Sequence, residues 1–175
     1  MIVRLGEGAL KTKFGEFLEV LYYDGRKEAF ALVMGDVKNS DDVLCRVHSS
    51  CISGHIFNSI ECDCREQMEL AQASIEQAGK GVIIWLDQEG KGNGHLAILA
   101  SRPLKRQGMS QGAAYEKVGY KADARDFTPA AEILRELEIR SVILLTDNPQ
   151  KANDLLNVGI RVSGTKPMNV SADQP

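Results

Sequence analysis

Hydrophobic and polar residues alternate along three short runs in the N-terminal part of the chain. The runs cover residues 17–22, 29–34 and 43–48, and turn signals at Asp24-Gly25 and Gly35-Asp36 separate them. Alternation with a period of two is typical of strands that are buried on one face. We therefore predict that this part of the chain forms an antiparallel sheet.

From Glu66 onward the hydrophobic spacing becomes helical. Apolar residues recur every three or four positions from Met68 to Ala78, and Gly79 supplies a stop signal for this helix. A continuous apolar run at residues 82–86 then predicts a buried strand.

The remaining sequence repeats this alternation of helix and strand. A helix is expected from Leu96 to Gln107, and Thr128 is expected to cap another that has Pro129 in its first turn. Residues 141–145 form the next apolar strand, and Pro149 begins one more helix.

These patterns predict a mixed α/β fold in which N-terminal antiparallel strands precede βαβ-type units. Strands that alternate with helices usually pair in parallel, and ligands bind where the C-terminal ends of such strands meet. No internal repeat or long linker divides the chain. We therefore expect one domain over residues 1–175, with a flexible tail at residues 166–175.

The composition agrees with one globular domain and narrows its partners. The 175 residues are 43% hydrophobic and 26% charged, the formal net charge is -3, and no stretch concentrates Lys and Arg. A small ligand is therefore favoured over a long nucleic acid. No segment has the length and hydrophobicity of a signal peptide or a membrane span. We expect a cytoplasmic protein with reduced cysteines and no membrane partner.

Three of the four cysteines carry the strongest chemical signal. Cys62 and Cys64 are two positions apart, so in an extended segment their side chains project to the same side, where Cys51 can join them. The charged residues around Cys62 and Cys64 argue against plain burial. Three thiolates leave one position of a zinc ion open, as in catalytic sites, where bound water ionises near neutral pH. The sequence therefore predicts one zinc ion per chain.

The fourth cysteine, Cys45, has a different environment. It shares one face of its strand with Val43 and Val47, whereas Arg46 and His48 point to the other face. This pattern predicts a buried apolar role for Cys45. If the metal were purely structural, Cys45 or His48 would have to complete its coordination. The chain would then be a zinc-stabilised nucleotide-binding module without turnover.

Five sequence blocks between residues 46 and 151 resemble the GTP cyclohydrolase II family in order and spacing. The blocks are Arg46-Val47-His48-Ser49-Ser50-Cys51, Cys62-Asp63-Cys64, Gln88-Glu89-Gly90, Asp123-Ala124-Arg125-Asp126-Phe127 and Thr146-Asp147-Asn148-Pro149-Gln150-Lys151. The resemblance implies a hydrolase in which zinc-activated water attacks C8 of GTP, and formate and pyrophosphate are released. The implied product is 2,5-diamino-6-ribosylamino-pyrimidinone 5′-phosphate, an intermediate toward riboflavin. The resemblance further implies a homodimer, and Mg²⁺ is a natural companion of the triphosphate.

The same resemblance implies roles for individual residues. Cys51, Cys62 and Cys64 would hold the zinc ion, Asp123 would accept a proton, and Arg125 matches the family's proposed nucleophile. The residues implied to contact the nucleotide are Arg46, Val47, His48, Ser49, Ser50, Gln67, Glu89, Gly90, Lys91, Thr146 and Lys151. Because a guanidinium stays protonated in almost any protein site, we expect Arg125 to stabilise charge on the transferring phosphate instead.

Two loops have the composition of ligand-binding loops. Residues 146–151 follow a strand and open a helix, whose free N–H groups suit a phosphate, although ordinary capping by Asn148 explains the same residues. The glycines from Gly90 to Gly94 match no established phosphate-binding pattern and indicate only a flexible loop. Lys91 can still reach a phosphate from that loop.

The chain departs from the family pattern most clearly at Arg102. This residue lies about where the family has a catalytic tyrosine, and the nearest tyrosine, Tyr115, lies downstream. A second hypothesis follows, in which hydrolysis stops at a formamidopyrimidine nucleotide, or a related purine nucleotide of another pathway is the substrate. His95 is a candidate acid or base in place of the missing phenol. A third hypothesis is a hydrolase that only removes pyrophosphate from a guanine nucleotide, using Arg125 and Mg²⁺.

Overall fold

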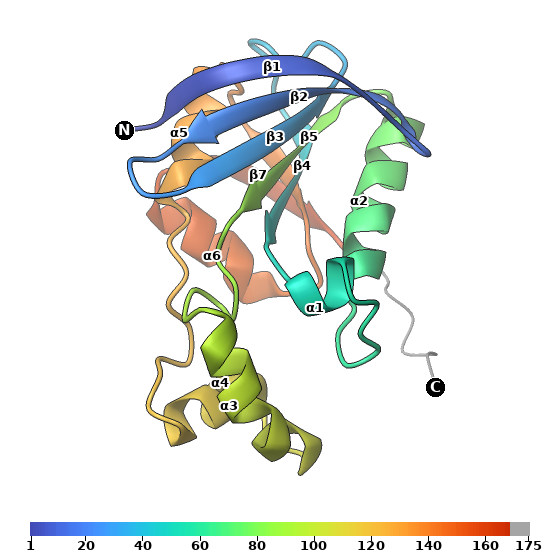
Figure 1. The fold of residues 1–175 in the computed structure, drawn as a ribbon. Helices are drawn as coiled ribbons and strands as arrows, with labels where there is room; N and C mark the ends of the chain where they lie inside the picture. The colour runs from blue at the N-terminus through green and yellow to red at the C-terminus, as the bar shows by residue number, and fades with distance from the viewer. Residues whose placement is uncertain (169–175) are drawn as a thin grey trace.

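The computed structural model describes residues 1–168 and has a mixed α/β fold built on one seven-stranded sheet (Figure 1). The strands are β1 (Val3–Thr12), β2 (Gly15–Tyr23), β3 (Glu28–Met34), β4 (Val43–Ser49), β5 (Gly81–Leu86), β6 (Val142–Leu145) and β7 (Val162–Lys166). The helices are α1 (Ile52–His55), α2 (Cys64–Ala78), α3 (His95–Arg106), α4 (Gln111–Lys117), α5 (Thr128–Glu136) and α6 (Pro149–Asn157). The predicted fold class is confirmed.

The sheet is antiparallel at one end and parallel at the other. Its order is β1-β2-β3-β5-β4-β6-β7, in which β1, β2, β3 and β5 pair antiparallel, while β4 pairs in parallel with both β5 and β6. The prediction that the run at residues 43–48 joins an antiparallel sheet was therefore wrong. The reason is that α2 connects β4 to β5, and a helical crossover returns the chain in the same direction.

Helices cover both faces of this sheet. On one face, Ile133 of α5 and Leu155 of α6 are fully buried in a cluster that contains Ile84 of β5. On the other face, Ile75 of α2 packs in a second cluster with Ile83, the next residue of β5. Figure 1 shows α2 on the side opposite α5 and α6. Burial of each of these side chains contributes about 1.5–3 kcal/mol, so the two clusters hold the strand ends in fixed positions.

The helix ends partly follow the predicted signals. Gly79 ends α2 in the left-handed conformation with φ 71°, and the side chain of Asn148 caps α6. The prediction that Thr128 caps α5 was wrong, because Thr128 is already helical and the cap residue is Phe127. The Oδ1 atom of Asp126 accepts a hydrogen bond from the backbone N–H of Thr128 at 2.9 Å. A carboxylate one residue further upstream thus performs the capping.

Four elements were not predicted from the sequence, namely β1, β7, α4 and the four-residue helix α1. The side chains of β1 are mostly exposed, β7 is short, and α4 is a seven-residue helix capped by Ser110. Figure 1 shows α3 and α4 projecting together away from the sheet. Met168, within the segment predicted to be a tail, is 8% exposed and packs in the cluster beneath α2. The rest of that segment, residues 169–175, lies outside the described residues.

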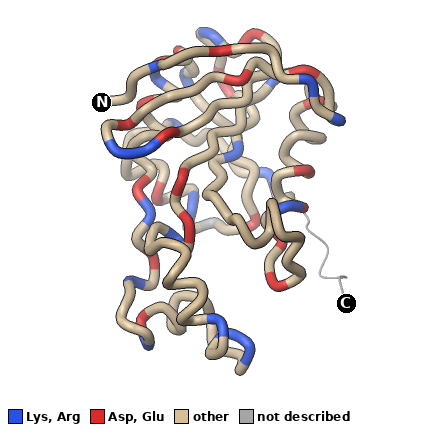
Figure 2. Tube along the Cα trace, viewed as in Figure 1, with Lys and Arg blue, Asp and Glu red and all other residues tan. Residues whose placement is uncertain are grey.

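Charged residues of both signs are spread along the described chain, and a basic stretch marks the C-terminal end of α3 (Figure 2). None of the described helices combines the length and hydrophobicity that crossing a bilayer requires.

Candidate active site

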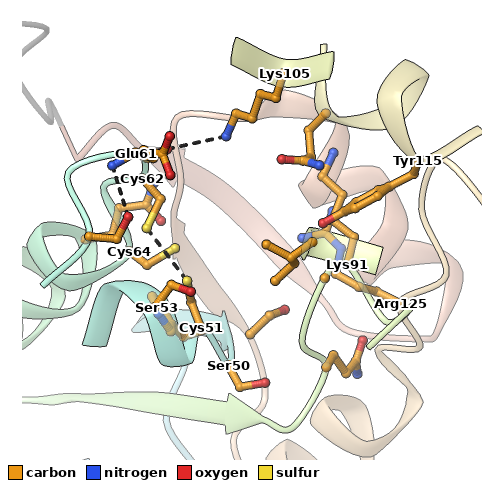
Figure 3. A pocket seen from close by; sticks show the side chains of 18 of the residues that line it. Ser50, Cys51, Ser53, Glu61, Cys62, Cys64, Lys91, Lys105, Tyr115 and Arg125 are labelled. Carbon is orange, nitrogen blue, oxygen red and sulfur yellow. Dashed lines mark hydrogen bonds between the residues drawn. The ribbon is translucent and has the colours of Figure 1, made fainter. Parts of the chain in front are cut away.

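A cavity of about 520 Å³ lies beyond the C-terminal ends of β4 and β5. One wall comes from β4, α1 and the loop that leads into α2, and the opposite wall comes from α3, α4 and the segment around Arg125 (Figure 3). Its volume is within the range of roughly 300–1,000 Å³ that small-molecule sites occupy. This location agrees with the ligand position expected for parallel strands.

Most of the predicted site residues line this cavity. They are Arg46, His48, Ser49, Ser50, Cys51, Cys62, Cys64, Gln67, Gly90, Lys91, Arg125 and Lys151. The other predicted residues, Val47, Glu89, Asp123 and Thr146, are not among its lining residues. The structure therefore brings most of the predicted residues together around one cavity, while the other four contact lining residues or their loops.

These supporting contacts are specific. The backbone carbonyl of Val47 accepts a hydrogen bond from the ammonium of Lys151. Both carboxylate oxygens of Glu89 accept from the backbone N–H of Ile52 at 3.2 Å, which fixes the start of α1. The hydroxyl of Thr146 accepts from the backbone N–H of Asn148 at 3.0 Å and stabilises the turn before α6. Thr146 thus has a role in the turn, and its contact with a nucleotide stays a prediction.

The three predicted metal-binding cysteines converge in the cavity wall. Their sulfur atoms all lie within 4.8 Å of one another, and the sulfurs of Cys51 and Cys62 are 3.7 Å apart. Cys45 of β4 is fully buried in the core cluster between the sheet and helices α5 and α6, as predicted. Among the described residues, neither Cys45 nor His48 belongs to the cluster. Three sulfur ligands are therefore available to a metal ion.

The backbone around the cluster differs from the prediction. Cys62 and Cys64 were expected to lie in an extended segment, but Cys64 is the first residue of α2 and Asp63 is its cap residue, with φ -105° and ψ 18°. Cys51 caps α1 directly after β4. The sulfurs meet because two helix starts face each other, and not because alternate residues of a strand share a side.

The sulfur spacing fits a zinc ion. Tetrahedral zinc with bonds of about 2.3 Å holds its sulfurs about 3.8 Å apart, close to the separation of Cys51 and Cys62. Hydrogen bonding with Cys51 and then with Cys64 lowers the pKa of the Cys62 thiol, whereas hydrogen bonding with Cys51 and then Cys62 raises the pKa of Cys64. The cluster therefore loses one proton easily and the last with difficulty. A bound cation would allow all three to be thiolates.

Gly54 of α1 provides the space for these sulfurs. A Cβ atom at this position would lie 2.8 Å from the sulfur of Cys62 and 3.4 Å from that of Cys51. We expect Gly54→Ala to lower zinc affinity by about 10–100-fold, in the range found when residues that position metal ligands are changed. Competition with a chromophoric chelator measures this affinity.

Gly112→Ala is the matched control for this prediction. Gly112 is also helical, and the three atoms nearest to a Cβ atom there would all belong to Ala122, at 3.4 to 3.8 Å, which are ordinary contacts. Its zinc affinity should equal that of the parent protein. Unchanged affinity in Gly54→Ala would show that the sulfurs do not hold the metal in the arrangement described.

Two histidines adjoin the cluster without joining it. The Nε2 atoms of His48 and His55 are 3.0 Å apart, and Nε2 of His55 is 3.1 Å from the carbonyl oxygen of Cys64. Burial, with the nearby charge of Arg46, lowers the pKa of His48 to about 2, so its imidazole is neutral. Its Nδ1 atom is buried and has no hydrogen-bond partner among the described residues. This atom is available to a ligand.

Positive charge dominates the cavity wall. The cations that line it are Arg46, Lys91, Arg102, Lys105, Arg106, Arg125 and Lys151. Among the described lining residues, Glu61 alone contributes a carboxylate, and it pairs with Arg106 at 2.6 Å. The cavity therefore suits an anionic ligand.

Two of these cations are buried against neutral groups. Nη1 of Arg46 donates to the carbonyl of Leu145 at 3.0 Å, and Lys151 donates to the carbonyl of Val47. Burial lowers the pKa of Arg46, and burial followed by the charges of Arg46 and Arg125 lowers that of Lys151. Buried cations cost free energy unless a counter-charge is bound nearby. An anion in the cavity would offset this cost.

Arg125 extends into the cavity from the segment that precedes α5. Its Nε atom donates to Oδ1 of Asp123 at 3.0 Å, and its Nη2 atom lies 2.5 Å from Oδ2. Burial would raise the pKa of Asp123, but the hydrogen bonds and charge of Arg125 lower it overall. A Cβ atom on Gly92 would lie 2.5 Å from the carbonyl oxygen of Ala124, so glycine is required where the two segments meet. The backbone N–H of Ala124 donates to the carbonyl of Lys91 at 2.8 Å.

The structure also places residues in the cavity that the sequence did not indicate. Tyr115 of α4 lines it, as does Arg102 of α3, which had been noted only as a departure from a pattern. Others are Ser53, Ser59, Glu61, Ile98, Lys105, Arg106 and Gln111. Tyr115 and Gln111 were difficult to identify from the sequence, since the seven-residue α4 on which they lie has no clear hydrophobic period. The N-cap signal of Ser110 could have identified this helix.

The chain is similar to known proteins over almost its whole length. Residues 4–167 match the family model described as GTP cyclohydrolase II. The riboflavin biosynthesis protein RibBA of Bacillus mycoides (strain KBAB4) is 40% identical over 172 residues, which cover 97% of this chain and 43% of that protein. The GTP cyclohydrolase-2 of Actinobacillus succinogenes (strain ATCC 55618 / DSM 22257 / CCUG 43843 / 130Z) is 39% identical over 175 residues, covering 99% of this chain and 81% of the relative. The chain thus spans less than half the length of the RibBA relative.

Proposed function

The chain belongs to the GTP cyclohydrolase II family, and on this basis we propose that it opens the imidazole ring of GTP at C8. Formate and pyrophosphate are released, and the product is 2,5-diamino-6-ribosylamino-pyrimidinone 5′-phosphate. The observation that carries the proposal is the convergence of three cysteine sulfurs in the wall of a cavity dominated by cations. The three sulfurs suit a metal ion that supports ring hydrolysis, and the cations suit a triphosphate.

Cys51, Cys62 and Cys64 would hold one zinc ion, which when bound would supply Lewis acidity and activate water for hydrolysis. Beside this cluster, Nε of Arg46 and Nδ1 of His48 are buried without hydrogen-bond partners among the described residues. A purine ring presents acceptors for the N–H of Arg46, and Nδ1 of His48 can donate to the base or accept from it according to its tautomer. These two residues are therefore proposed to orient the base.

The guanine edge also presents donors, namely a ring N–H and an amino group. Acceptors for them can come from Gln67, Gln88 or Glu89. Gln67 lines the cavity, but its Oε1 atom accepts a hydrogen bond from Arg46. Both oxygens of Glu89 accept from the backbone of α1. Gln88 lines the cavity and binds the backbone of Asp126. Each of these three side chains would have to give up or share one of its present hydrogen bonds when the base binds.

The triphosphate would lie against Lys91, Arg125 and Lys151, with Mg²⁺ as a further counter-charge. Arg125 would stabilise negative charge on the transferring phosphate, because its guanidinium stays protonated. Asp123 would hold that guanidinium by accepting hydrogen bonds from its Nε and Nη2 atoms. The homodimer, the cytoplasmic location and the single-domain organisation of residues 1–175 stay predictions.

Incubation of zinc-loaded protein with GTP tests the proposal. We expect loss of the purine absorption spectrum, one formate and one pyrophosphate per GTP, and the mass of the deformylated pyrimidine monophosphate. Pyrophosphate with an intact purine spectrum would instead identify a hydrolase of the phosphate chain. Unchanged GTP that remains bound would identify a binding module without turnover.

One observation favours a second candidate function. Arg102 lines the cavity at the position where a catalytic tyrosine was expected, and its guanidinium lies 3.6 Å from the carboxylate of Glu61. A guanidinium is a poor proton donor compared with a phenol. If no other group replaces the phenol, hydrolysis would end at the formamidopyrimidine nucleotide, whose mass retains the formyl group.

A further inference from the structure

Tyr115 is a buried tyrosine whose side chain extends into the cavity. It lies on α4, is 2% exposed and lines the cavity. Figure 3 shows its ring extending from the wall opposite Cys51 and Cys64 toward the open space between the two walls. The residue therefore has the position of a group that contacts the ligand.

The hydroxyl of Tyr115 lacks a protein partner. No hydrogen bond to it exists within residues 1–168, whereas the hydroxyl of Tyr22, the other fully buried tyrosine in that range, donates to Glu136 at 2.6 Å. The oxygen of Tyr115 is not among the buried polar atoms without a partner, so it is open to the cavity, and a tyrosine hydroxyl in such a position pairs with water or with a ligand. At Tyr115 the cavity lies beside the hydroxyl, so a bound substrate can provide this partner.

The surroundings keep this phenol protonated. Burial, followed by the charges of Glu89 and Cys51, raises the pKa of Tyr115 to about 12. Near neutral pH the group is therefore a hydrogen-bond donor and not a phenolate.

Arg102 is not free to take this role. Its Nε atom lies 3.6 Å from Oε2 of Glu61, and its Nη2 atom lies 3.5 Å from Oγ of Ser53. These contacts direct the guanidinium toward the loop that precedes Cys62. Helices α3 and α4 pack on each other, so Tyr115 brings a phenol to the wall that Arg102 also helps to form.

We propose that Tyr115 donates a hydrogen bond to the substrate and supplies the proton for release of the formyl group. The proposal rests on the function proposed above. In this step water adds to the formyl carbon, the carbon–nitrogen bond breaks, the amino nitrogen gains a proton and formate leaves. Tyr115 gives its proton to that nitrogen and regains one from the water, and the second proton of the water passes to solvent as formic acid ionises to formate. This assignment deepens the proposed function by providing the phenol absent at position 102.

The test compares Tyr115→Phe with Tyr120→Phe. Tyr120 is partly buried and is not among the lining residues of the cavity, so the second variant is a matched loss of one hydroxyl. Formate, pyrophosphate and product mass are measured for each protein with GTP. We expect Tyr115→Phe to release formate about 100-fold more slowly, as for loss of a general acid, and to accumulate the formylated pyrimidine. Tyr120→Phe should behave like the parent protein.

Three results would overturn the proposal. Formate release by Tyr115→Phe at the parent rate would exclude the hydroxyl from this step. Ring opening without any formate from the parent protein would mean that the step does not occur, while the ring-opening function stands. Failure of the parent protein to consume GTP would remove the proposed function itself. Because phenylalanine keeps the ring packed, an unchanged melting temperature establishes that each variant is folded.

Discussion

Replacing Cys51 with alanine is expected to remove the bound zinc and to lower turnover of GTP by about 10³-fold or more. The magnitude follows because the activation that a metal supplies amounts to several kcal/mol, and each 1.36 kcal/mol changes a rate about tenfold. The fold should persist, because the sulfur cluster lies outside both hydrophobic clusters of the described chain. Metal analysis, circular dichroism and a GTP assay on the same preparation check these three expectations.

Cys45→Ala is the matched control for this prediction. Cys45 is fully buried in the core and is not part of the sulfur cluster, so its replacement should leave zinc and activity unchanged. It should lower the free energy of unfolding by roughly 1 kcal/mol, as for the loss of a group of methylene size. If Cys51→Ala instead unfolds the domain, the metal is structural and a binding module becomes the better interpretation.

The fold was predictable wherever burial imposes a period on the sequence. Residues 82–86 are nearly all buried, and they were recognised because β5 lies between two layers of helices. The strand β1 was missed because its side chains are mostly exposed, so solvent imposes no alternation on it. The predicted antiparallel pairing of β4 was wrong for another reason. Alternation reveals a strand but not its neighbours, and the crossover through α2 determines them.

The site was predictable where chemistry is local and less so where it depends on tertiary contacts. The three cysteines were identified from their residue type and neighbours, although the geometry that unites them comes from two helix starts. The hydrogen bonds that Glu89 accepts from the backbone of α1 could not be foreseen, because they depend on how α1 packs beside the loop after β5. Tyr115 was not identified as a site residue, because it reaches the cavity through the packing of α4 on α3. No hydrophobic period in the sequence predicts that packing.

Replacing Arg125 with alanine is the second change with a large expected effect. We expect pyrophosphate release to fall by about 10²–10³-fold, as for the loss of one donor that stabilises charge in the transition state. Arg125 reaches the cavity with a side chain that is 14% exposed, and Asp123 holds it by accepting hydrogen bonds from its Nε and Nη2 atoms. Lysine should restore little activity, because a single ammonium cannot bind Asp123 and a phosphate with the planar geometry of a guanidinium. Steady-state release of pyrophosphate from GTP measures both variants.

The zinc content separates this role from damage to the rest of the site. Arg125 lies on the wall opposite the sulfur cluster, so its replacement should leave one zinc ion per chain (Figure 3). Arg140→Ala is the control, since Arg140 forms an exposed ion pair with Asp41 at 2.8 Å, and exposed pairs contribute little. Activity of Arg125→Ala within twofold of the parent protein would exclude the guanidinium from phosphate chemistry. Asp123 and Arg125 would then be no more than an ion pair at the mouth of the cavity.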